Sequence, residues 1–213
     1  MSRSGPWPAD PVERAAAAAA AGLRRPVPPE TPAALDLLVA SDPDPRVRAA
    51  SLGALGRLPD PPIESWLRAA ADPDPSVRRR AADLAPAFGG AIAGALVQLL
   101  GDGDGAVSEA AAWALGELGA EAVAARAVAR LAELAGSHAD PLVREAAVAA
   151  LGSLGDPDGL DAVLVACRDK PAIRRRAVLA LAAFDGPAVD AALRAALTDK
   201  DWQTRQAAED LLD

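Results

Sequence analysis

One short segment recurs along the chain, and this repetition constrains the fold more than any other feature. An Asp-Pro-Asp-Pro-x-Val-Arg segment at residues 42–48 returns at residues 72–78, and looser copies follow. The Val of each copy, or the residue in its place, defines an anchor position, and the anchors are Val47, Val77, Val107, Val143, Ile173 and Thr204. Successive anchors are 30, 30, 36, 30 and 31 residues apart. A fixed period of this length is typical of stacked units that cannot bury a core alone.

Each unit is predicted to contain two helices. After an anchor, apolar residues return at the spacing of one helical face, as in Val143, Ala147, Leu151 and Leu154. Asp with Pro close behind marks the start of this helix, and Gly or Pro marks its end. A shorter apolar helix precedes each anchor, at residues 32–40, 63–71, 91–100, 122–135, 159–167 and 189–197. Alanine supplies 56 of the 213 residues and favours helix throughout, so the sequence predicts an all-α solenoid.

The fullest copy, at residues 143–155, reads Val-Arg-Glu-Ala-Ala-Val-Ala-Ala-Leu-Gly-Ser-Leu-Gly and resembles the HEAT repeat. The likeness is to the short bacterial form that is also found in phycobilin lyases, and it covers about residues 30–213 as six units. It implies a right-handed superhelix of antiparallel helix pairs, in which the second helices, those that begin at the anchors, line a concave face. We expect residues 1–29 to form a degenerate or capping helix with a Pro-rich connector. Residues 30–213 are expected to form one solenoid domain.

Composition excludes several kinds of site. The chain has one Cys and one His, so it cannot form an internal disulfide or assemble a zinc site rich in Cys and His. We therefore expect no catalytic residue, no metal and no cofactor. Twenty-two basic residues against 30 acidic ones give a net charge of −8, which argues against a surface built entirely for nucleic acid or anionic membrane. No segment reads as a signal peptide or a membrane span, so the protein is expected to be cytoplasmic, without membrane insertion.

Several units place an Asp six residues before an Arg. The pairs are Asp42 and Arg48, Asp72 and Arg78, and Asp199 and Arg205. Such pairs are compatible with catalysis, but the resemblance implies that they form a structural hydrogen-bond ladder between adjacent loops. Ser108 and Arg168 depart from the pattern and are expected to interrupt the ladder.

Positions off the buried stripe of the anchor helices are the candidates for binding a partner. Trp113 and Leu179 are large apolar side chains at such positions, and the sequence leaves open whether Trp113 is exposed or fills a gap among alanines. Two basic clusters flank an acidic middle on these positions. The candidate charged residues are Arg79, Arg80, Arg175 and Arg176, with Glu109, Glu117 and Glu145.

These observations favour a non-catalytic scaffold or adaptor that binds a protein or peptide on its concave face. In this hypothesis Trp113 and Leu179 are apolar anchors and the Arg pairs orient the partner. Two alternatives stay open. One is nucleic-acid binding along the Arg stripes, and the other is an accessory protein similar to the phycobilin lyases.

Overall fold

The computed structural model describes residues 7–124 and 126–212, and every regular element among them is a helix. The helices form two compact units, Met1–Leu96 and Val97–Asp213. The helices that begin at the anchor positions are called anchor helices below, and those that precede them are called companion helices. The all-α solenoid predicted from the repeat spacing is confirmed. That residues 30–213 act as one domain of six repeats stays a prediction.

The N-terminal unit opens with α1 (Pro11–Ala21), which packs on the anchor helix α3 (Pro45–Leu55). Its other elements are α2 (Thr31–Ser41), α4 (Ile63–Ala70), α5 (Pro75–Phe88) and the short 3-10 helix η1 (Gly90–Ile92). The anchor helices α3 and α5 pack on each other, while the companion helices α2 and α4 pack on α3 and α5 respectively. The companion helix α6 (Ala93–Leu99) runs across the boundary between the units in the sequence.

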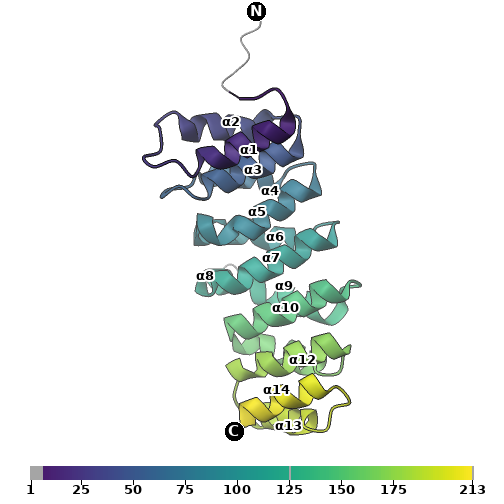
Figure 1. Cartoon of the computed structure of the whole chain (residues 1–213). Coiled ribbons are helices and arrows are strands. Elements are labelled where there is room, and N and C mark those ends of the chain that lie inside the picture. The colour runs from purple at the N-terminus through teal and green to yellow at the C-terminus, as the bar shows by residue number, and fades with distance from the viewer. Residues whose placement is uncertain (1–6, 125, 213) are drawn as a thin grey trace, which may run out of the picture. The chain divides into compact units, whose positions relative to one another are not determined.

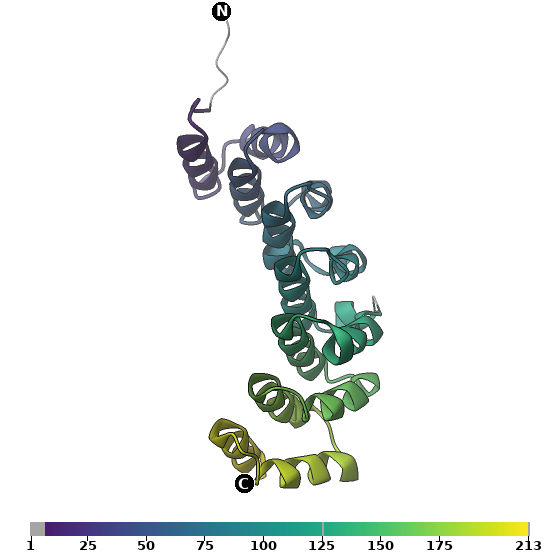
Figure 2. The same ribbon diagram turned by 90° about the vertical axis from the view of Figure 1, so that its right-hand side faces the viewer.

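The C-terminal unit repeats this arrangement in two layers (Figures 1 and 2). Its anchor helices are α7 (Gly105–Leu118), α10 (Pro141–Leu154), α12 (Pro171–Ala180) and α14 (Trp202–Leu212). In this layer α10 lies between α7 and α12, and α12 packs on α14. The companion helices are α9 (Ala127–Ser137), α11 (Leu160–Ala166) and α13 (Pro187–Ala196), with the short helices α8 (Ala120–Ala124), η2 (Pro157–Gly159) and η3 (Leu181–Ala183) beside them.

The predicted helix starts are confirmed at most anchors. The Asp residues that stand before α3, α5, α7 and α10 each accept a main-chain N–H two residues ahead, which satisfies one of the free amides of the first helical turn. Pro occupies the first turn of α3, α5 and α10, where its missing N–H costs nothing. Gly155 ends α10 in the left-handed conformation, with φ 59°, that glycine adopts most readily.

The anchors themselves form the core that joins the helices. All six anchor residues are buried, with at most 1% of the surface of each exposed. Trp66 is also fully buried, and its indole N–H donates to the carbonyl of Ala81 at 2.7 Å, so it is a packing residue of α4. Between the anchor helices the contacts are very close, because a Cβ added to Gly152 of α10 would lie 2.6 Å from the Cβ of Ala180 of α12.

One predicted helix is wrong. The sequence predicted a continuous helix over residues 122–135, but α8 ends at Ala124 and α9 begins at Ala127. Arg126 precedes α9 with φ 62°, a left-handed conformation that interrupts a right-handed helix. The longer interval before Val143 is thus accommodated by an additional short helix.

Candidate binding site

The recurring Asp and Arg residues form bonds both within a repeat and between neighbouring repeats. Within a repeat, Nη1 of Arg48 donates to the main-chain carbonyl of Asp42 at 2.9 Å, and Arg78 and Arg205 make the equivalent bonds to Asp72 and Asp199. The carboxylates instead accept from an arginine one repeat earlier. Nε and Nη2 of Arg48 both reach the carboxylate of Asp72, each at 2.7 Å.

The same two-pronged pairing occurs in both compact units. The arginines and their partners are Arg14 with Asp42, Arg48 with Asp72, Arg144 with Asp169, and Arg174 with Asp199. The guanidinium of Arg174 holds the pKa of Asp199 below its ordinary value, as Arg144 does for the pKa of Asp169. Each of these carboxylates accepts two guanidinium N–H groups, an arrangement suited to fixing the register of adjacent repeats.

The expected interruption at Arg168 is wrong. Asp169 supplies the carboxylate one residue later, accepts from Arg144 and offers its main-chain carbonyl to Arg174 at 2.9 Å. The loop therefore keeps the bonding pattern although the spacing changes by one residue. Ser108 takes the place of an arginine, and its hydroxyl reaches the carbonyl of Asp102 at 3.4 Å.

A shallow hollow opens on the anchor layer of the C-terminal unit. Trp113 on α7 and Leu179 on α12 stand at its rim, with 41% and 44% of their surfaces exposed. The hollow has a volume of about 370 Å³. Its lining residues are Trp113, Ala149, Gly152, Ser153, Arg176, Leu179, Ala180, Ala182 and Ala183, and we call it the Trp113–Arg176 pocket.

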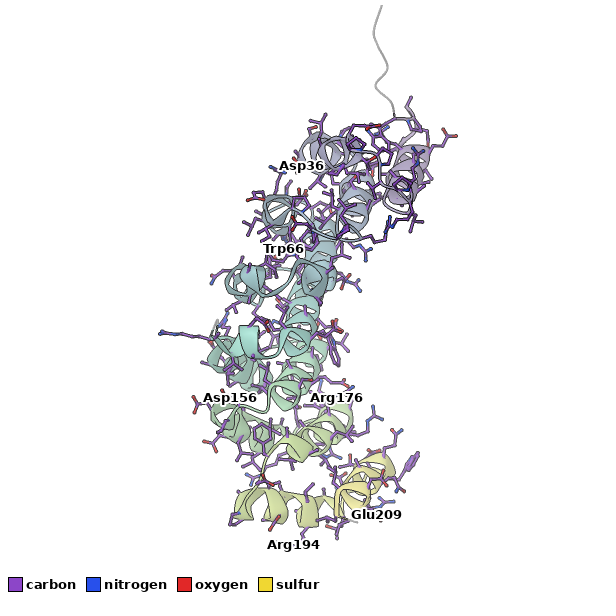
Figure 3. The ribbon with its side chains drawn as sticks, turned by 90° about the vertical axis from the view of Figure 1, so that its left-hand side faces the viewer. Asp36, Trp66, Asp156, Arg176, Arg194 and Glu209 are labelled. Atoms are coloured by element: carbon purple, nitrogen blue, oxygen red, sulfur yellow. The ribbon has the colours of Figure 1, made fainter. Side chains whose placement is uncertain are left out.

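The pocket exists because the middle helix carries small side chains. Trp113 and Arg176 come from α7 and α12, which lie on opposite sides of α10. On this face α10 presents only Ala149, Gly152 and Ser153, so the larger side chains meet across it. Figure 3 labels Arg176 on the anchor layer and Arg194 of α13 on the companion layer.

Arg176 is held in place without hydrogen bonds. Its guanidinium carbon lies 5.4 Å from the centroid of the Trp113 ring, which is cation–π distance. Its Nη2 lies 3.7 Å from Oε1 of Glu145, too far for a hydrogen bond. Among the residues that the structure describes, Glu145 is thus an ion-pair partner of Arg176 without a hydrogen bond, and the Nε of Arg176 is buried without a hydrogen-bond partner.

The remaining predicted partner-binding residues are placed differently. Nη1 of Arg175 donates to Oε1 of Gln203 at 2.6 Å, and neither residue lines the pocket. Glu109 is half-buried on α7 and Glu117 is exposed on the same helix. The predicted basic pair Arg79 and Arg80 lies on α5 of the N-terminal unit and takes no part in the pocket. The small lining residues were not predicted as site residues, although several occupy the non-buried positions that the sequence singles out.

Three further properties of residues 7–124 and 126–212 concern metal binding, thiol reactivity and membrane crossing. No group of three or more His, Cys, Asp or Glu side chains there could hold a metal ion. Burial raises the pKa of Cys167 to about 11, which leaves its thiol protonated and unreactive at neutral pH. Within the same residues, no helix has the length and apolar character needed to cross a bilayer.

A family model described as HEAT repeats matches residues 61–136 and 128–213, which together are more than half of the chain. The chain belongs to the HEAT-repeat family. The matched residues begin before α4 and include the helices from α4 to α14. No curated protein matches this HEAT-repeat chain.

Solved structures show the same fold at low sequence identity. An engineered protein is 22% identical with a TM-score of 0.63, and the match covers 96% of this HEAT-repeat chain but 64% of that protein, so the chain spans less than two thirds of it. A computationally designed armadillo repeat protein for modular peptide recognition is 16% identical with a TM-score of 0.55, covering 92% and 97% of the two chains. A chain from the structure of Kap95p with RanGDP is 14% identical with a TM-score of 0.63, covering 96% and 34%.

Proposed function

We propose that this HEAT-repeat protein is a non-catalytic interaction module that binds a protein or peptide through the Trp113–Arg176 pocket. The observation that carries the proposal is the half-exposed Trp113 beside Arg176, whose guanidinium makes no hydrogen bond among the described residues, above a floor of small side chains. Tryptophan and arginine are the residue types that contribute most to binding at protein interfaces. Solenoids commonly use an extended face of this kind to bind other proteins.

The similar structures agree with this class of function. One is described as a repeat protein designed for peptide recognition, and another as Kap95p binding RanGDP. The ladder carboxylates support a module without catalysis, because a carboxylate that already accepts two guanidinium bonds is a poor general base. A volume of 370 Å³ lies at the small end of ligand sites, which favours one or two peptide side chains over a large tetrapyrrole.

Affinity capture from native lysate tests the proposal. The natural chain, a Trp113→Ala, Arg176→Glu variant and a matched Trp202→Ala control are compared, each with and without nuclease. Trp202 is 64% exposed and lies outside the pocket, so its replacement removes an exposed indole elsewhere. Circular dichroism first establishes that all three chains are equally helical.

We expect a protein that the natural chain and the control retain, that the pocket variant loses, and that nuclease does not release. Retention that disappears with nuclease would favour nucleic-acid binding instead. Capture that is equal for all three chains would place the binding surface outside the pocket and overturn the proposal.

A further inference from the structure

Arg176 differs from the ladder arginines in what its N–H groups do. The ladder arginines Arg48, Arg144 and Arg174 each direct several N–H groups at carboxylate and carbonyl oxygens. Arg176 has five N–H groups and, among the described residues, places none of them on an acceptor. A third of its side-chain surface is exposed and the residue lines the pocket, while its Nε is buried.

The Trp113 ring fixes the position of these donors. A guanidinium that stacks on an indole loses little further freedom when it binds, so it is pre-organised for a planar partner. Carboxylates match the guanidinium fork in two parallel hydrogen bonds. The site is therefore built to accept a carboxylate at one end.

The other end of the pocket has different chemistry. Leu179, Ala182 and Ala183 supply exposed apolar surface, and the buried Ala180 lies at the pocket wall. Burying an apolar side chain here is favourable in proportion to the area removed from water. A ligand that fills the whole pocket thus has a carboxylate and an apolar group side by side.

We infer that the Trp113–Arg176 pocket binds a peptide segment in which an Asp or Glu side chain adjoins an apolar side chain. The carboxylate binds the free N–H groups of Arg176, and the apolar side chain lies against Leu179 and the alanines. This inference rests on the proposed function, because it specifies the partner of the same pocket.

Charge complementarity selects this segment over other anions and over cations. A basic segment would meet the guanidinium of Arg176 directly and is repelled. A phosphate carries up to two negative charges and is usually recognised by a cluster of arginines, whereas the pocket offers one guanidinium, which already faces Glu145 at 3.7 Å. A ligand with a single negative charge meets less repulsion from that glutamate than a phosphate does.

A random peptide library displayed on phage, selected on the intact chain, tests the inference. One selected sequence is then synthesised with both ends blocked, together with its Glu→Gln or Asp→Asn counterpart. Affinities are measured by calorimetry for the natural chain, for Arg176→Gln, for Leu179→Ala and for Trp113→Ala. The matched control is Arg175→Gln, which removes a neighbouring arginine that does not line the pocket. Circular dichroism and urea unfolding establish that the variants are folded, as expected for Arg176, which forms no hydrogen bond among the described residues.

We expect the selected peptides to share an acidic residue beside an apolar one. Removing the peptide carboxylate should weaken binding to the natural chain and to Arg175→Gln about ten-fold or more. The same change should alter the affinity for Arg176→Gln very little. Leu179→Ala should weaken binding of both peptides alike.

The other outcomes separate the two proposals. Peptides that depend on Trp113 and Leu179 but not on the carboxylate, or that need a free C-terminus, would overturn this inference and leave the proposed function standing. Selection of basic peptides that need the pocket residues would likewise overturn this inference and leave the proposed function standing. If no selected peptide depends on Trp113 or Leu179, both proposals fail.

Discussion

Arg46 and Arg48 both lie on α3, two residues apart, yet only Arg48 should contribute substantially to stability. Arg46 pairs with Asp44 at the surface, with 61% of its side chain exposed, whereas Arg48 pairs with Asp72 where the two side chains are 12% and 6% exposed. Exposed ion pairs contribute little, but a buried carboxylate that loses its donors is strongly penalised. We predict that Arg48→Met lowers the free energy of unfolding by about 2 kcal/mol and that Arg46→Met has a much smaller effect. If urea denaturation showed the same loss of unfolding free energy for both variants, the structural role of the ladder would be contradicted.

The ladder carboxylates also predict how stability depends on pH. Arg144 holds the pKa of Asp169 below its ordinary value of 3.8, and Arg174 acts likewise on the pKa of Asp199. A carboxylate whose pKa is lowered by folding stabilises the fold above its unfolded pKa, and this contribution is lost as the pH falls through the folded pKa. We expect unfolding free energies to be level near neutral pH and to fall from about pH 5 downward. Asp169→Asn should lower the unfolding free energy at pH 7 and make its fall at acid pH less steep. Urea titrations at several pH values measure both effects.

Individual residues also show where prediction from the sequence stops. The resemblance to HEAT repeats implied a ladder of Asp and Arg between adjacent loops, and the bonds from Arg48 to Asp72 are of this kind. The exposure of Trp113 was not predictable, since it depends on how much volume α10 and α12 place around the ring. Trp113 and Arg176 are more than sixty residues apart in the sequence and come from non-adjacent anchor helices, so their contact depends on small side chains of the helix between them.

At the scale of elements, the anchor helices approach each other through glycine. A Cβ at Gly152 would lie 2.6 Å from the Cβ and 2.8 Å from the Cα of Ala180, so α10 and α12 would have to separate. We predict that Gly152→Ala destabilises the protein by about 1–3 kcal/mol through overpacking. Gly136 in α9 is the matched control, because its added Cβ would meet nothing within 4 Å. There the higher helix propensity of alanine should stabilise the fold by up to about 1 kcal/mol. Thermal unfolding should therefore shift in opposite directions for the two variants.

The helices themselves were largely predictable, for a physical reason that also explains the exception. Apolar periodicity, Asp caps and terminal Gly or Pro act within one or two turns, so the sequence near each anchor determines where its helix begins. The segment between α7 and α10 lacks such a marker, since residues 120–137 are almost uniformly helix-forming. Nothing in this local sequence marks the interruption at Arg126, where φ is 62°.

At the scale of the whole molecule, stability should vary along the stack in the manner of a chain of neighbouring interfaces. Within the C-terminal unit α10 packs on α7, α9 and α12, whereas α1, at the start of the described chain, packs mainly on α3. Helices with more neighbours open only when several interfaces are lost together, so their amides should be protected longer. We predict by hydrogen exchange that the amides of α10 exchange slowest and that those of α1 are among the first helical amides to exchange. Peptide-resolved mass spectrometry under native conditions measures both rates in one experiment. Slow exchange in α1, at the level of α10, would mean that the protein unfolds as one cooperative unit, and the nearest-neighbour description would then not apply.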